Sequence, residues 1–189
     1  MYATFPSDKL LDGSLSDAST ESLLSSLGFK EWKAARRHLQ HIAAKSEQVH
    51  NSVTRLLPYL LMTLSTCADP DQALVNMGRF TDNAQAGEIF LQLEKNPRTI
   101  EILVSIFSGS QFLAEILLRN PENVQILTSR DRLSHQKTIK DFIDEGTDAI
   151  RDLPVTDQMN ALKRYQKGEL LRIGAGDLLS LYDLPAVTS

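Results

Sequence analysis

Apolar residues recur at helical spacing along almost the whole chain from about Thr20 onward. Positions i, i+3, i+4 and i+7 share one face of an α-helix, and no strand-like alternation competes with this pattern. An isolated helix of this length is marginal in water, so each apolar row predicts a helix packed against a neighbour. The clearest rows are Ala86, Ile89, Phe90 and Leu93; Ile100, Leu103, Val104 and Phe107; Phe112, Leu113, Ile116 and Leu117; and Ile139, Phe142, Ile143 and Ile150.

Capping residues followed by proline mark several helix starts. Asp69-Pro70, Asn96-Pro97 and Asn120-Pro121 each place a capping side chain before a residue whose missing N–H costs nothing in the first turn. Ser134 is a further candidate N-cap. Pro58 falls inside an apolar run and predicts that a long helix kinks or restarts there.

The fold class predicted from these patterns is all-α, a multi-helix bundle of stacked helical hairpins. The 9 glycines and 7 prolines in 189 residues are too few for an all-β fold, which needs a turn about every 8 to 12 residues. The eight residues from Asn96 recur 24 positions later from Asn120, which favours a local duplication of one hairpin. Residues 1–18 are expected to be a mobile N-terminal segment and residues 19–189 a helical domain.

Composition limits the compartment and the partners. The single cysteine, Cys67, forms no intramolecular disulfide, so a reducing compartment, the cytoplasm, is expected. Neither a secretory signal nor an apolar run of about 18 to 20 residues is present, and no membrane association is expected. A net charge of −4 argues against a globally basic nucleic-acid binder.

A search for reactive or ligand-binding patterns predicts no catalytic, cofactor-binding or metal-binding residue. Gly13 to Asp17 superficially resembles a nucleotidyltransferase signature, but a serine stands where the second metal-binding acid belongs. His38 and His41 share a helix without an identifiable third zinc ligand. Cys67 ends an apolar row, which favours a buried inert thiol over a nucleophile.

Two basic stretches have several readings. The stretch from Lys30 to Lys45 makes one predicted helix locally positive around Trp32, and a second lies between Lys163 and Arg172. A solvated helix face is the favoured interpretation, and a docking surface for an acidic partner and a nucleic-acid site are the alternatives.

Two phrases resemble glutamine synthetase adenylyltransferase, the enzyme family that adds AMP to glutamine synthetase and removes it. Ser105 to Glu122 reads SIFSGSQFLAEILLRNPE, and Leu162 to Leu184 reads LKRYQKGELLRIGAGDLLSLYDL. The first is similar to the family pattern S-x-F-L-A-E-x-L-L-R-x-P-E, and the second to the pattern L-R-R-x-[RK]-x-x-E-[LM]-L-R-I-x-x-R-D-L, in the same order along the chain. Gly168 and Gly176 depart from the charged residue and the arginine typical of the family.

The resemblance implies an N-terminal helical fragment that precedes a nucleotidyltransferase domain absent from this chain. It implies ATP and magnesium as cofactors of the parent enzyme, none of them in this fragment, and glutamine synthetase and a nitrogen-signalling regulatory protein as partners. Arg164, Glu169, Arg172 and Asp177 are the candidates for contact with the following domain, since a bidentate arginine fixes orientation well. A free-standing helical protein–protein interaction module is the alternative function.

Overall fold

The computed structural model describes residues 6–82, 86–128 and 130–179, and in these ranges the only regular elements are helices. The predicted all-α fold class is therefore confirmed. The chain divides into two units, Met1–Ala114 and Glu115–Ser189, a division that the sequence patterns do not predict. Within the described residues, no helix is both long enough and apolar enough to cross a membrane.

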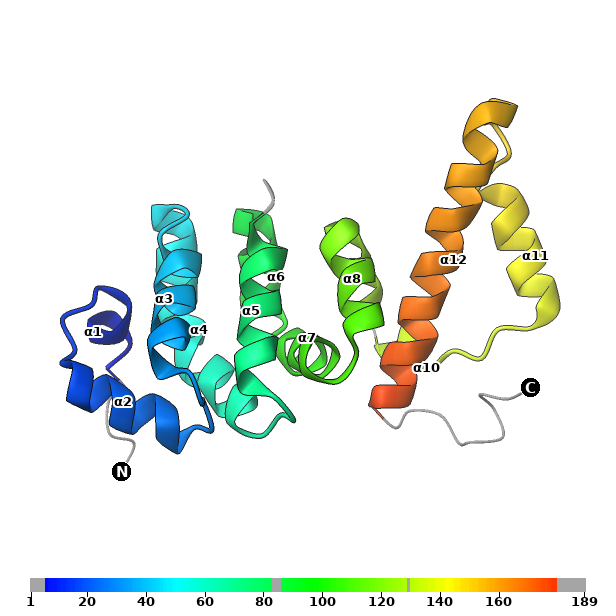
Figure 1. Cartoon of the computed structure of the whole chain (residues 1–189). Coiled ribbons are helices and arrows are strands. Elements are labelled where there is room, and N and C mark those ends of the chain that lie inside the picture. The colour runs from blue at the N-terminus through cyan, green and yellow to red at the C-terminus, as the bar shows by residue number, and fades with distance from the viewer. Residues whose placement is uncertain (1–5, 83–85, 129, 180–189) are drawn as a thin grey trace. The chain divides into compact units, whose positions relative to one another are not determined.

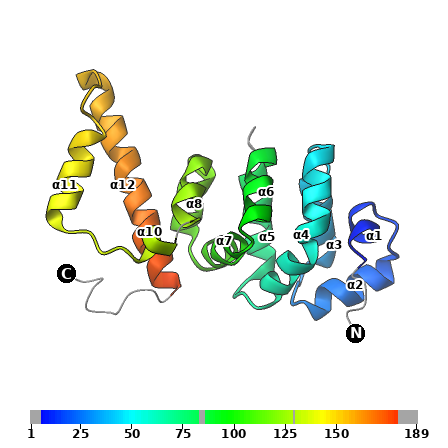
Figure 2. The ribbon, with the colours of Figure 1, turned by 180° about the vertical axis from the view of Figure 1, so that it is seen from behind.

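The first unit stacks helices side by side (Figures 1 and 2). Each helix has one apolar face, and α3, α4, α5 and α7 pack these faces together around the fully buried Phe80 and Phe107, whose ring centroids lie 5.7 Å apart. The helices are α1 (Ser7–Leu11), α2 (Asp17–Ser26), α3 (Trp32–Ala43), α4 (Glu47–Ser65), α5 (Pro70–Thr81), α6 (Ala86–Lys95) and α7 (Arg98–Gly109), followed by α8 (Gln111–Arg119), which spans the boundary between the units.

The N-terminal stretch contributes to this unit. Helix α1 buries Leu10 and Leu11, and it contacts α3 and α4. Helical content does not measure mobility, so the expected mobility of residues 1–18 stays a prediction.

Side-chain capping explains where some of the helices begin, among them α2, α4, α5 and α11. Asp69 accepts a hydrogen bond from the Gln72 backbone N–H at 3.0 Å, and Pro70 opens α5 as predicted. Helix α7 begins at Arg98, so Pro97 and not Asn96 occupies its N-cap position, which corrects the prediction there. Pro58 lies inside α4, which runs without a break from Glu47 to Ser65, so the predicted restart does not occur.

The second unit contains η1 (Pro121–Asn123), α9 (Val124–Leu127), α10 (Arg130–Ser134), α11 (Ile139–Asp148) and α12 (Val155–Leu178). The duplicated phrase therefore begins one long helix, α7, in its first copy and two short turns of helix in its second. Ser134 closes α10 and does not cap the next helix, which corrects the prediction. Thr138 is the N-cap of α11 because Thr138 and Asp141 form a reciprocal capping box.

Burial follows most of the predicted apolar rows. Ile89, Phe90 and Leu93 are buried, as are Ile100, Leu103, Val104 and Phe107, and three of the four residues from Phe112 to Leu117 that form the third row. Phe112 itself is exposed, and so are Ile139 and Ile143 of the fourth row. Ile139, Phe142 and Ile143 of this row lie on α11, and Ile150 follows the end of that helix. Phe142 and Ile150 are half-buried, so the described residues cover the row only in part.

Candidate functional site

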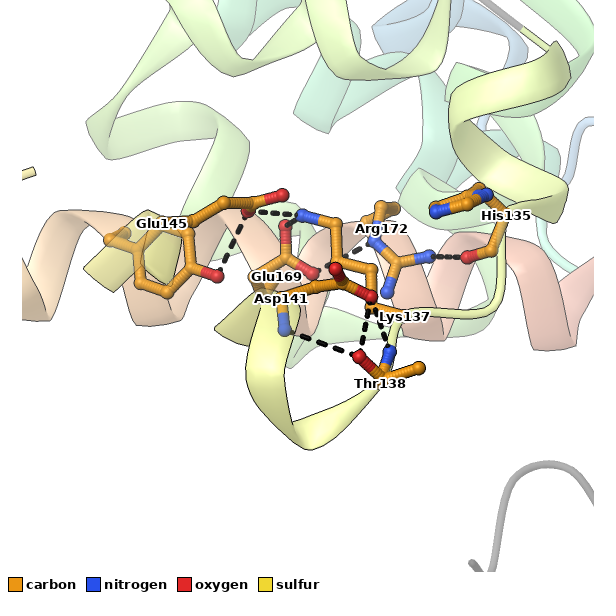
Figure 3. Close-up of polar contacts among 8 residues, drawn as sticks. His135, Lys137, Thr138, Asp141, Glu145, Glu169 and Arg172 are labelled. Atoms are coloured by element: carbon orange, nitrogen blue, oxygen red, sulfur yellow. Dashed lines mark hydrogen bonds and ion pairs between the residues drawn. The ribbon is translucent and has the colours of Figure 1, made fainter. Parts of the chain in front are cut away.

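Glu169 and Arg172, two of the predicted site residues, lie one turn apart on α12 and form an ion pair at its surface toward α11 (Figure 3). Arg172 Nε donates to Glu169 Oε2 at 2.8 Å, as residues at i and i+3 on one helix can. Arg172 Nη1 donates to the backbone carbonyl of His135 at 2.7 Å. The guanidinium is therefore held between its own helix and the segment that links α10 to α11.

Lys137 completes the cluster from that same linking segment. Its Nζ lies 2.7 Å from Glu169 Oε1 and also donates to Glu145 Oε2 of α11. The side chains of Lys137, Glu169 and Arg172 are only 13%, 14% and 6% exposed. Lys137, Glu145, Glu169 and Arg172, with Tyr165, are called the α12 ion network below.

The local sequence explains why Lys137 lies next to Glu145 and Glu169. The capping box of Thr138 and Asp141 fixes the first turn of α11, and Lys137 directly precedes that turn. Glu145 lies two turns further along α11 and receives a hydrogen bond from the Tyr165 hydroxyl of α12 at 3.0 Å. The two helices and the linking segment therefore meet at four charged side chains of balanced sign.

Protonation states follow from these contacts. Burial raises the pKa of Glu145, but the hydrogen bonds from Lys137 and Tyr165 outweigh it and hold that pKa below its usual value. Burial and the hydrogen bond to Glu145 raise the pKa of Tyr165. At neutral pH the carboxylate is thus ionised and the phenol protonated, the states in which their hydrogen bond is made.

The α12 ion network fastens one segment to another. Both glutamates and both cations are paired, and removing Glu169 would deprive the buried Arg172 of its carboxylate partner. The arrangement holds the α10–α11 connection against α12, and it thereby fixes how α11 and α12 lie relative to each other.

The four predicted interdomain residues thus separate into two groups. Glu169 and Arg172 have partners within their own unit, whereas Arg164 and Asp177 are exposed on α12 and lie outside the network. The interdomain role of all four stays a prediction. Lys137, Glu145 and Tyr165 are missed by sequence reasoning, and the only signal for Lys137 is its place next to the T-x-x-D capping box.

His41 and the nucleotidyltransferase-like segment have other roles in the structure. His41 Nε2 lies 2.8 Å from Asp82 Oδ1. Gly13 adopts a φ of +83° that glycine tolerates best, and Ser16 caps α2. Among the described residues, no group of three or more His, Cys, Asp or Glu side chains is placed to hold a metal ion.

Two of the cations in the basic stretch from Lys30 to Lys45 also have partners within the chain. Arg36 donates to Asp17 Oδ1 at 2.8 Å and to the Gly13 carbonyl at 2.7 Å, which ties the loop before α2 to α3. Lys45 pairs with Asp82. Part of this positive charge is therefore used to join segments of the first unit.

Comparison with known proteins gives a consistent family. The model of the glutamate-ammonia ligase adenylyltransferase family matches residues 100–189. The bifunctional glutamine synthetase adenylyltransferase/adenylyl-removing enzyme of Leifsonia xyli is 30% identical over 174 residues, and that of Streptomyces coelicolor is 26% identical over 177 residues. No solved structure gives a significant match.

The alignments cover most of this chain but only a small part of each relative. Each of the two alignments covers 89% of this chain but only 17% of the relative, so the chain spans about a sixth of the length of the curated relatives it matches. The similarity also extends well beyond the two phrases from which it was predicted. The predicted resemblance of this chain to a part of glutamine synthetase adenylyltransferase is therefore confirmed.

Proposed function

We propose that this chain is a non-catalytic helical scaffold of an enzyme that adds AMP to glutamine synthetase and removes it. The observation that supports the proposal is the structural role of Arg172, which belongs to the second phrase shared with the family. Its guanidinium is buried and is hydrogen-bonded to Glu169 and to the His135 carbonyl. The charged residues of that phrase thus hold helices together and do not line an open site.

The chemistry of AMP transfer belongs, in this proposal, to a nucleotidyltransferase domain that follows the helical region. ATP and magnesium are the cofactors proposed for that domain, and glutamine synthetase and a nitrogen-signalling regulatory protein are its proposed partners. The names of the curated relatives support the transfer to glutamine synthetase and the reverse reaction. The lone Cys67 supports a cytoplasmic site of action.

A chimera tests the scaffold role. The aligned region of the Leifsonia xyli relative is deleted, or replaced by this chain, and transfer of labelled AMP from ATP to glutamine synthetase is measured. We expect the deletion to lose transfer and the replacement to restore it. The isolated chain should transfer no label, and label transfer by the isolated chain would overturn the proposal.

A free-standing interaction module is the second candidate. The observation that favours it is the concentration of exposed apolar side chains on α11 and α12, among them Ile139 and Val155. A module of this kind binds its partner without any attached enzyme, whereas the scaffold restores activity only in the chimera. Restored transfer in the chimera therefore separates the two functions.

A further inference from the structure

Helices α11 and α12 carry an unusual share of exposed apolar surface. Seven of the ten large apolar side chains that are exposed in the described residues lie between Ile139 and Leu178. Soluble proteins normally expose such side chains singly, and a concentration of them marks a binding surface. The members on the two helices are Ile139, Ile143, Val155, Met159, Leu170 and Leu178.

Most of these side chains lie on one side of the α11–α12 pair. The two helices are antiparallel, and the contacts that fix this are Glu145 with Tyr165 and the close approach of Gly146 to Leu162. Successive residues of an α-helix are rotated by about 100° about its axis. On this scale, the exposed row on each helix lies roughly 80° away from the side that faces the other helix. Viewed along each helix from its N-terminus to its C-terminus, the rotation has the same sense. Because the two helices run in opposite directions, rotations of the same sense bring both rows to the same side of the helix pair.

This side is called the α11–α12 apolar face below. Ile139 and Ile143 contribute to it from α11, and Val155, Met159 and Leu170 from α12. Its exposed fractions are large: Val155 is 82% exposed and Met159 59%. An amphipathic helix laid along such a face is a recurrent mode of recognition.

Positive charge predominates along the edges of the face. On the α12 side, the wheel positions next to Met159 and Leu170 hold Lys163 and Lys167, and the exposed Asp177 lies two turns beyond Leu170 on the same row. On the α11 side, Lys140 accompanies Asp144. An occupant with an acidic flank is favoured by this border. A two-fold pairing of this chain is disfavoured, because it would place Lys163 and Lys167 opposite the same lysines or opposite Lys140.

We propose that the α11–α12 apolar face binds an amphipathic helix of a partner protein, with acidic residues along the flank of that helix that lies beside Lys163 and Lys167. The apolar side of the partner covers Ile143 and Met159, and its carboxylates pair with Lys163 and Lys167. The proposal requires no activity of a parent enzyme, so it stands or falls independently of the scaffold function.

A pair of designed peptides tests the proposal on the intact chain. Each peptide is a capped helix of about 18 residues with leucines at i, i+3, i+4 and i+7, long enough to be helical alone. One peptide has glutamates on both flanks and the other has lysines at the same positions. Calorimetric titration should give a Kd about tenfold lower for the acidic peptide at low salt, with the difference shrinking at high salt.

Variants assign the binding to this face. Met159→Asp should raise the Kd of the acidic peptide by about tenfold. Met62→Asp is the matched control, because Met62 is also 59% exposed but lies on α4 in the other unit. Lys163→Glu combined with Lys167→Glu should reverse the preference between the peptides, and circular dichroism checks that each variant stays helical.

Several outcomes would overturn the proposal. Equal affinity for both peptides, a preference for the lysine peptide, or no effect of Met159→Asp excludes a helix with an acidic flank. Self-association of the wild type that Met159→Asp abolishes would make a second copy the occupant. Binding to vesicles containing anionic lipid, with neither peptide bound, would make it a lipid surface.

Discussion

Arg172 and His135 are 37 positions apart, and the Arg172 guanidinium donates a 2.7 Å hydrogen bond to the His135 backbone carbonyl. The same guanidinium pairs with Glu169, which in turn pairs with Lys137, only two residues after His135. Arg172 and Glu169 together therefore hold the two ends of a short linking segment to α12. The position of α11 depends on this attachment, because Lys137 directly precedes Thr138, the N-cap of α11.

Replacing Arg172 should loosen the linking segment. Arg172→Met removes both hydrogen bonds and leaves the His135 carbonyl without this donor, and we expect a loss of about 2–3 kcal/mol in local stability. Arg172→Lys keeps the charge but not the two-pronged geometry, so it should lose a smaller amount. Hydrogen exchange of the amides at positions 135–138 measures the effect.

Arg164 supplies the control for this experiment. It lies on the same helix but is exposed, so Arg164→Met should change exchange at positions 135–138 by less than about 0.5 kcal/mol. Equal effects of the two methionine variants would mean that the buried hydrogen bonds do not hold the segment.

The Glu169–Arg172 pair shows how far sequence reasoning reaches at this site. Residues three apart on a helix are neighbours by geometry alone, so their pairing is predictable. Lys137 lies 32 positions from Glu169, and no local pattern reports that the α10–α11 segment folds back onto α12. Contacts of this kind depend on the tertiary arrangement, which periodicity does not encode.

For the fold, too, local features are predictable from the sequence and tertiary contacts are not. Helical spacing predicts the part of the row from Ile139 to Ile143 that lies on α11, but spacing alone does not tell whether another helix of this chain covers those residues. Ile139 is 80% exposed although its spacing is that of a core residue. The start of α11 was misplaced at Ser134 because a single capping residue is a weaker signal than the reciprocal box formed by Thr138 and Asp141.

Tyr59 should ionise unusually late. Burial and the hydrogen bond that its hydroxyl donates to Glu101 raise the pKa of Tyr59 to about 12. Because the folded pKa is raised, the stabilising contribution is complete below the unfolded value near 10 and is lost as the pH rises toward 12. The tyrosinate absorbance that Tyr59→Phe removes should therefore have its midpoint near pH 12.

Glu101→Gln refines this prediction. Burial is the larger cause of the shift, so loss of the carboxylate should lower the Tyr59 pKa only part of the way to its ordinary value. A midpoint near pH 10 in the wild type would contradict the buried environment of the phenol.

Cys67 should react slowly with alkylating reagents. Burial raises the pKa of its thiol, which lowers the fraction of thiolate, and the side chain is also half-buried. Iodoacetamide at pH 8 should modify the native chain at least about fivefold more slowly than glutathione. Mass spectrometry gives an unambiguous reading because the chain has one cysteine, and unfolding in urea should remove the protection.

The stability effect of Gly168→Ala should depend on the residue at position 126, whereas the effect of Gly146→Ala should not. Alanine is favoured over glycine in a helix interior by about 0.5–1 kcal/mol, but a Cβ at position 168 would lie 3.3 Å from Ile126 Cδ1. We therefore expect Gly168→Ala to gain little alone and to gain the full amount with Ile126→Val, which removes that methyl group. At position 146 the nearest atom, Tyr165 Cε1, is 3.7 Å away, so Gly146→Ala should stabilise α11 without help. Urea denaturation of the single and double variants measures the coupling, and an equal gain from Gly168→Ala in both backgrounds would show that the two segments do not meet as described.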